Sequence, residues 1–118
     1  MNVYDKAYEL ARALKDSPEA KEWAEANANL AGDPDAKRML DDFRKRQTDA
    51  ERALLEGKEL PQEEKDKLNK LYEVLLLHGG IRRVLDAERR LAQLWADTQK
   101  IIGEAWQELL EKAQRPES

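Results

Sequence analysis

The fold of this chain is decided by residues 81–113, IRRVLDAERRLAQLWADTQKIIGEAWQELLEKA. No proline interrupts this stretch, and its apolar residues recur every three or four positions, which is the period of one face of an α-helix. The stretch therefore predicts a single helix about 50 Å long. Its apolar stripe contains Ile81, Val84, Leu91, Trp95, Ile102, Ala105 and Leu109, and Leu85, Leu94, Ile101, Trp106 and Leu110 widen it.

The rest of the chain predicts four further helices, over residues 3–15, 18–30, 34–56 and from 61 to the Gly79-Gly80 pair. Residues that cap helices or start them mark these bounds, because Asn, Ser and Asp side chains accept backbone hydrogen bonds and proline suits a first helical turn. Two glycines in succession predict either a break or a sharp kink before the last helix. The predicted inner faces are Ala20, Trp23, Ala24 and Asn27 in the second helix, Ala36, Leu40, Phe43, Gln47, Ala50 and Leu54 in the third, and Leu68, Leu71, Tyr72, Leu75 and Leu76 in the fourth.

These patterns predict an all-α fold, an elongated bundle of about five helices, three of them long, packed antiparallel. A length of 118 residues fits one domain. We expect residues 1–113 to form that helical domain and residues 114–118 to be a frayed C-terminal tail.

The length of the last helix also predicts self-association. A compact chain of this size has a diameter of about 35 Å, so part of a 50 Å helix must overhang with its apolar stripe uncovered. A homodimer or a tetramer is the expected result. The residues expected on the oligomer or partner face are Leu91, Trp95, Ile102, Trp106 and Leu109.

Composition limits the possible functions. Charged residues make up 39% of the chain, but the net charge is −4, so strong non-specific binding to nucleic acid is not expected. No apolar run is long enough for a membrane span or resembles a secretion signal, which predicts a cytoplasmic protein. The chain has no cysteine, which excludes disulfides, thiolate-bound zinc and cysteine-held iron–sulfur clusters.

The sequence offers no constellation for catalysis. His78 is the single histidine, and it accompanies no nucleophile motif and no second metal-binding residue. We interpret it as a residue at a helix C-terminus that meets the last carbonyls, in preference to a general base or a metal ligand. Acidic pairs such as Asp41-Asp42 lie among lysines and arginines, as on a solvated helix face. We therefore predict no enzyme, no cofactor and no metal site.

Glu88 is the one charge within the apolar stripe of the last helix. A charge there is costly unless it is paired, so Glu88 is a candidate for fixing helix register or partner choice through Arg44 or Arg83. The alternative is a residue at the edge of the stripe that reaches solvent.

Basic residues cluster at Lys37, Arg38 and 44–46, and again within 82–90. They suggest an alternative function, an RNA-binding protein that uses these arginine and lysine clusters. Direct contact with nucleic acid is the less favoured interpretation, because acidic residues interleave with the basic ones and no aromatic residue is placed among them for base stacking. Trp23, Trp95 and Trp106 are interpreted as core or interface residues.

Several runs resemble the YlbF/YmcA/YheA family of small helical bacterial proteins. They include residues 4–11 (YDKAYELA), 36–39 (AKRM), 87–91 (AERRL) and 100–102 (KII), and the YheA-like branch is the most similar. The resemblance implies long antiparallel helices and homo- or hetero-oligomers. It also implies a link to RNA processing, because two other branches join a complex that adjusts a membrane-tethered endoribonuclease.

Those complexes are associated with cysteine-bound iron–sulfur clusters, which a chain without cysteine cannot ligate. From the residues and the resemblance together, we expect a non-enzymatic interaction protein or adaptor. A protein partner in RNA processing is the partner that the resemblance implies.

Overall fold

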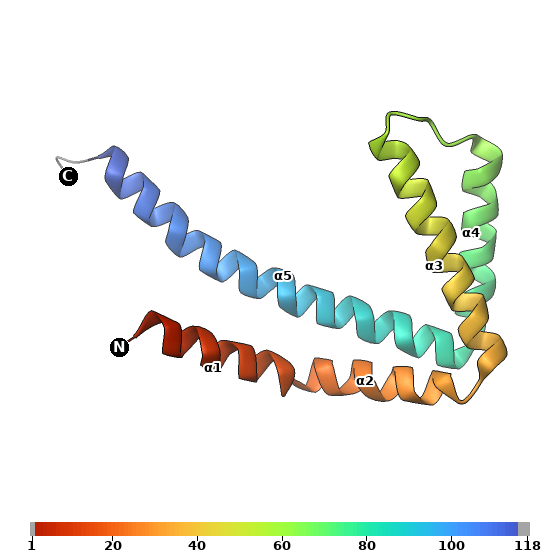
Figure 1. Cartoon of the computed structure of the whole chain (residues 1–118), viewed down its shortest axis with the longest axis horizontal. Coiled ribbons are helices and arrows are strands. Elements are labelled where there is room, and N and C mark those ends of the chain that lie inside the picture. Colours follow the sequence, from red (N-terminus) through yellow and green to blue (C-terminus); the bar gives the residue numbers. More distant parts are fainter. Residues whose placement is uncertain (1, 116–118) are drawn as a thin grey trace.

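The structure is a computed structural model that describes residues 2–115, and within this range it contains five helices and no strand. Figure 1 shows them in chain order. This arrangement confirms the all-α prediction. The helices are α1 Val3–Lys15, α2 Pro18–Ala31, α3 Pro34–Leu55, α4 Gln62–Leu76 and α5 Gly79–Gln114.

Local caps explain why three of the helices begin where they do. The Asn2 side chain accepts a hydrogen bond from the Tyr4 N–H at 2.8 Å, and Ser17 Oγ accepts one from the Ala20 N–H at 3.1 Å. Asp33 Oδ1 caps α3 in the same way. Each of these side chains satisfies an N–H that has no partner within its helix, so the sequence signals were read correctly.

The chain breaks between α4 and α5, but the break lies before the two glycines. Leu77 and His78 form the connection, and Gly79 and Gly80 belong to the first turn of α5. The backbone N–H of His78 bonds the Leu75 carbonyl at the end of α4, yet its side chain caps α5 by accepting from the Ile81 N–H at 3.2 Å. The prediction that His78 meets the last carbonyls of the preceding helix was therefore wrong for its side chain, which caps the following helix.

The helices form two arms joined at an elbow (Figure 1). In one arm α1 and α2 run antiparallel to α5, and in the other α3 and α4 form a hairpin that stands across it. The principal extents are 60 × 37 × 18 Å, and the radius of gyration is 19.9 Å, against about 13.5 Å for a compact chain of this length.

The core lies at the elbow, where α2, α3, α4 and α5 meet. No residue of α1 is buried, and in the described part of α5 none is buried beyond Ala87. In α2 the buried residues are Ala26 and Leu30. The inner face predicted around Trp23 was therefore wrong, because the buried side of α2 is rotated from it by part of a turn. Phe43 closes the core with its ring 5.7 Å from that of Tyr72. The buried residues are Ala26, Leu30, Ala36, Leu40, Phe43, Leu75, Ile81, Val84 and Ala87.

Candidate functional site: an uncovered helical face

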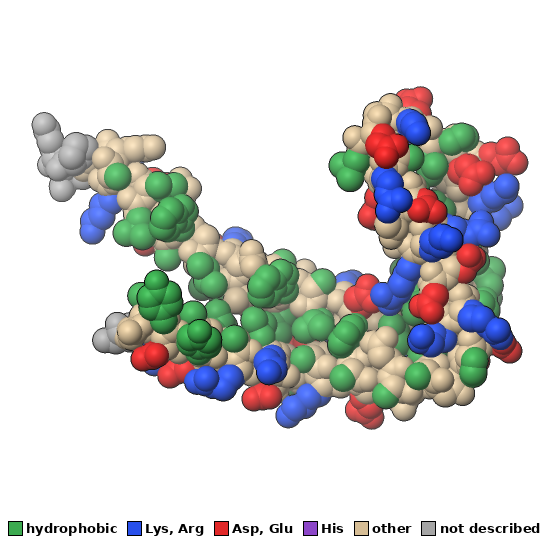
Figure 2. Space-filling view, in the orientation of Figure 1, with side chains coloured by type: hydrophobic (Ala, Val, Ile, Leu, Met, Phe, Trp, Pro, Cys, Tyr) green, Lys and Arg blue, Asp and Glu red, His purple; other side chains and the backbone are tan. Residues whose placement is uncertain are grey.

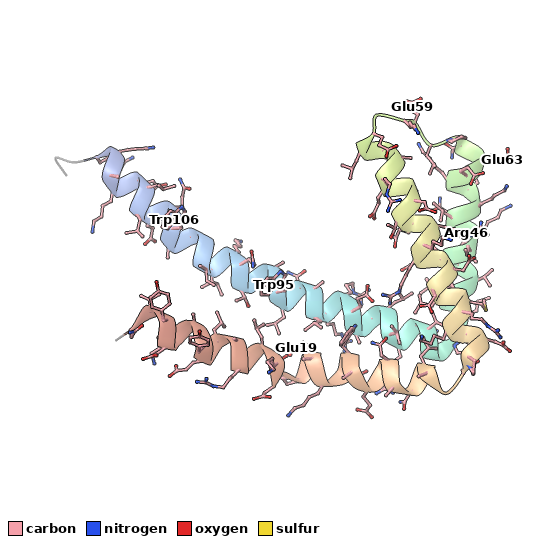
Figure 3. The ribbon with its side chains drawn as sticks, viewed as in Figure 1. Glu19, Arg46, Glu59, Glu63, Trp95 and Trp106 are labelled. Atoms are coloured by element: carbon pink, nitrogen blue, oxygen red, sulfur yellow. The ribbon has the colours of Figure 1, made fainter. Side chains whose placement is uncertain are left out.

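The second half of α5 extends beyond the core with its apolar side chains exposed. Trp95 is 54% exposed and Trp106 is 63% exposed, and both project from the part of α5 that leaves the elbow (Figure 3). Ile102 and Leu109 are also more than half exposed, whereas Leu91 is partly buried. Large aromatic side chains seldom remain this exposed unless a partner covers them.

The charges of this half of α5 are confined to one side of the helix. At about 100° per residue, Asp97, Lys100, Glu104 and Glu108 fall within one quarter of the circumference, opposite Trp95. The remaining circumference between residues 91 and 110 carries no charged side chain. A broad uncharged face of this kind suits the apolar centre of a protein–protein interface and does not suit a phosphate backbone.

α1 lies across an open space from this half of α5 and also exposes apolar side chains (Figure 2). Tyr4 is 76% exposed and Tyr8 is 67% exposed. Among the described residues, α1 contacts α2 and no other helix. The packing of α2 and α5 leaves both tyrosines exposed.

Arg83 links α5 to α2 below this surface. Arg83 of α5 forms a two-pronged hydrogen bond to Glu22 of α2, from Nε to Oε2 at 3.0 Å and from Nη2 to Oε1 at 2.8 Å, and Glu25 lies 3.5 Å from the same nitrogen. The hydrogen bond from Arg83 lowers the pKa of Glu22, and the same bond raises the pKa of Arg83. Arg83 is therefore occupied by α2 and does not pair with Glu88.

Glu88 lies at the junction of the two arms. Its Oε2 accepts a hydrogen bond from Nη2 of Arg44 at 2.6 Å, which links α5 to α3. The structure thus places Arg44, and not Arg83, opposite Glu88. The role of this contact in helix register remains a prediction.

A groove of about 500 Å³ runs between the start of α2 and the middle of α5. Glu19, Glu22 and Asp97 contribute acidic side chains to it, whereas Arg90 contributes the basic one and Leu94 an apolar wall. Figure 3 shows Glu19 in the first turn of α2, below Trp95. Leu94 belongs to the same stretch of α5 as Trp95, so the groove adjoins the uncovered face on the side of the elbow.

The elbow contains a second polar link, between the caps of two helices. His78 Nε2 lies 3.1 Å from Oδ2 of Asp33, whose Oδ1 caps α3. The backbone N–H of Ala36, and then the His78 side chain, lower the pKa of Asp33. This pairing assigns His78 a structural role, which the sequence spacing of 45 residues did not suggest.

The basic clusters of α3 and α5 are largely neutralised by neighbouring carboxylates. Lys37 pairs with Asp41 at 3.7 Å along α3, and Arg46, which is labelled in Figure 3, pairs with Asp42 at 3.1 Å. These contacts leave little unbalanced positive charge for a phosphate backbone. Further pairs join Arg38 to Asp35 and Arg89 to Asp86.

The described residues offer no group of three or more histidine, cysteine, aspartate or glutamate side chains arranged to hold a metal ion. Within the same part of the chain, no helix has both the length and the apolar character for a membrane span. The uncovered face of α5, flanked by α1, is therefore the strongest candidate for a functional site.

Comparison with known proteins places the chain in a family. The family model described as "Control of competence regulator ComK, YlbF/YmcA" matches residues 3–107. A UPF0342 protein from Symbiobacterium thermophilum is 48% identical over 103 residues, which cover 87% of this chain and 92% of the relative. Another, from Clostridium tetani, is 40% identical over 105 residues, with 89% and 90% covered.

Two solved structures share the fold. One is a protein of unknown function (DUF964) from Bacillus stearothermophilus, with a TM-score of 0.83, 19% identity and 98% of each chain covered. The other is Bacillus subtilis RicA in complex with RicF, with a TM-score of 0.62, 24% identity, and 92% of this chain and 96% of that one covered. The chain belongs to the YlbF/YmcA family, which confirms the resemblance seen in its sequence.

Proposed function

We propose that this member of the YlbF/YmcA family is a non-enzymatic adaptor that binds another protein chain through the uncovered face of α5. The observation that carries the proposal is a helix of 36 residues whose second half projects from the core with Trp95 and Trp106 exposed. The contact residues we assign are Leu91, Trp95, Ile102, Trp106 and Leu109.

Within that role we place the adaptor in the regulation of RNA processing, with a protein of that machinery as its partner. The support is family membership. The family model is described by control of the competence regulator ComK, and one structural neighbour was solved as RicA in complex with RicF.

The alternative function, an RNA-binding protein, predicts retention of RNA that weakens steeply as salt rises. The interleaved ion pairs of α3 lend it no support. A filter-binding titration with single-stranded RNA at about 50 and 200 mM salt separates the two proposals. Salt-dependent retention would favour the alternative, whereas salt-insensitive binding to a protein favours the adaptor.

The adaptor proposal is tested with Trp95→Glu and a matched control, Lys100→Glu. The first places a carboxylate in the apolar face, and the second places one on the charged side of the same helix, five positions away. We expect Trp95→Glu to abolish capture of RNA-processing proteins from a nuclease-treated lysate of the native host, while Lys100→Glu retains it. Equal capture by wild type and both variants would show that this face does not bind the partner.

A further inference from the structure

The elbow between the two arms (Figure 1) holds the His78 ring against the first turn of α5. A Cβ built on Gly80 would lie 3.1 Å from Cε1 and 3.4 Å from Nδ1 of this ring, and 3.5 Å from Cδ1 of Leu30. A Cβ on Gly79, beyond its own chain neighbours, would meet no described atom within 4 Å. Only the second of the two glycines is therefore needed to make room for the ring.

The two ring nitrogens of His78 have opposite hydrogen-bonding roles. Nδ1 accepts a hydrogen bond from the Ile81 N–H at 3.2 Å, so Nδ1 carries no proton. Nε2 lies 3.1 Å from Oδ2 of Asp33, and because a carboxylate can only accept, Nε2 carries the proton and donates it. The neutral ring with its proton on Nε2 is the one form of histidine that makes both bonds.

Asp33 stays ionised over the range in which histidine changes its charge. The pKa of Asp33 lies below its ordinary value of 3.8, because the Ala36 N–H and then the His78 side chain donate to its carboxylate. Histidine side chains change their charge between about pH 5 and 8. Within this range the ring gains or loses a proton, while the carboxylate keeps its role as an acceptor.

The charges that act on the ring come from α3 and α5. The Asp33 carboxylate favours a proton on the ring, whereas the positive ends of the α3 and α5 helix dipoles oppose it. Arg82 lies one turn along α5, and its N–H bonds the His78 carbonyl at 2.9 Å. Leu30 of α2 approaches with an apolar side chain, and Leu75 of α4 with a backbone carbonyl. The His78 side chain is 39% exposed, so water can deliver the proton directly.

We propose that His78 is a proton-operated latch for the elbow, and that Gly80 makes room for it. In the neutral ring, Nδ1 caps α5 while the Nε2–H group bonds the residue that caps α3, so one side chain ties the starts of both helices together. A proton from water that binds Nδ1 turns this acceptor into a donor, which cannot bond the Ile81 N–H. The ring then keeps Asp33 and releases α5, and the two arms adopt a wider range of angles.

The first test identifies the protonated nitrogen. His78 is the single histidine of the chain, so its ring signals in a proton–nitrogen correlation spectrum belong to no other residue. At neutral pH we expect a proton on Nε2 and none on Nδ1. A proton on Nδ1 at neutral pH would overturn the proposal.

The second test follows the cap of α5 as the pH falls. Between about pH 7.5 and 5, the hydrogen-exchange protection factor of the Ile81 amide should fall about fivefold in the wild type, as expected for the loss of one cap. His78→Asn is the matched variant, because an asparagine side chain caps a helix and does not titrate. Its Ile81 protection factor should stay constant. No change in the wild type, or an equal change in both proteins, would contradict the latch.

Two alanine variants test the role of Gly80. Gly80→Ala should push the ring off the first turn of α5, so that both neutral tautomers are populated and the Ile81 amide is already weakly protected at neutral pH. Gly79→Ala adds the same methyl group one position earlier, where it meets nothing, and should match the wild type. Equal results for the two variants would overturn the role of Gly80.

A distance measurement tests whether the latch controls the two arms. The chain has no cysteine, so spin labels on Lys58→Cys, between α3 and α4, and on Lys100→Cys of α5 report the separation of the arms. With labelled chains diluted in unlabelled ones, the distance distribution should broaden between about pH 7.5 and 5, and the same pair in a His78→Asn background should show no change. A distribution that stays constant with His78 present would overturn the release of α5.

The latch goes beyond the adaptor function, because it concerns the elbow and not the uncovered face of α5. The capture experiment with Trp95→Glu and Lys100→Glu examines that face at one pH. Failure of the latch would leave the capture result unchanged, and failure of the capture would leave the response of Ile81 unchanged.

Discussion

Nη2 of Arg44 lies 2.6 Å from Oε2 of Glu88, and this contact joins α3 to α5 across 44 positions of the sequence. Both side chains are more than a third exposed, so water screens the pair and its contribution is less than about 1 kcal/mol. We therefore expect the contact to affect how α3 and α5 are oriented more than how stable the fold is.

Replacing Glu88 by glutamine should lower the free energy of unfolding by less than about 1 kcal/mol, because a neutral amide keeps one hydrogen bond and loses the charge. Urea titrations of Glu88→Gln, Arg44→Gln and the double variant measure the coupling between the two residues. A change in solution mass accompanying the small loss of stability would favour a role in register. An unchanged mass and an unchanged melting temperature would exclude it.

Removing a core side chain at the elbow should lower the free energy of unfolding by much more than removing the charge of Glu88. Leu75 is fully buried, and Leu75→Ala should lower the free energy of unfolding by about 2–5 kcal/mol through lost burial and the cavity left behind. Leu77→Ala is the matched control, because Leu77 is 84% exposed two residues away. Circular dichroism during urea unfolding provides the measurement, and equal effects of both variants would contradict the position of the core.

The link between the two caps predicts a specific pH dependence. Hydrogen bonds from the Ala36 N–H and from His78 lower the pKa of Asp33 below its ordinary value of 3.8. The carboxylate of Asp33 therefore binds a proton more readily in the unfolded chain than in the folded one. The stability that the carboxylate supplies is fully present above pH 3.8 and is lost as the pH falls through the lower pKa of the folded state.

Asp33→Asn should accordingly melt at a lower temperature than wild type at neutral pH, and the difference should shrink as the pH falls below 3.8. Melting temperatures of both proteins, measured from neutral pH to below pH 3.8, give this difference. Asp49→Asn, on the exposed middle of α3, serves as the control and should follow the wild-type curve. A constant offset for Asp33→Asn at every pH would show that the charge of Asp33 is not involved.

Helix existence and most helix bounds were predictable from the sequence, because the signals that determine them are local. The Ser17-Pro18 and Asp33-Pro34 pairs each combine a side chain that satisfies an unpaired N–H with a proline suited to the first turn. The apolar period of the last stretch likewise predicted a helix that extends beyond the core. These features depend on residues within about one turn of each other or on a repeating spacing.

Only the tertiary structure decided which parts of each stripe are buried, because burial depends on what lies across from a residue. Leu40 and Leu54 share the stripe of α3, yet Leu40 is buried in the core, whereas Leu54, in the last turn of α3, is 57% exposed. The pairing of His78 with Asp33, and of Arg83 with Glu22 in preference to Glu88, follows from the same long-range arrangement. The sequence by itself determined five amphipathic helices, and the way they pack left α1 and the second half of α5 uncovered.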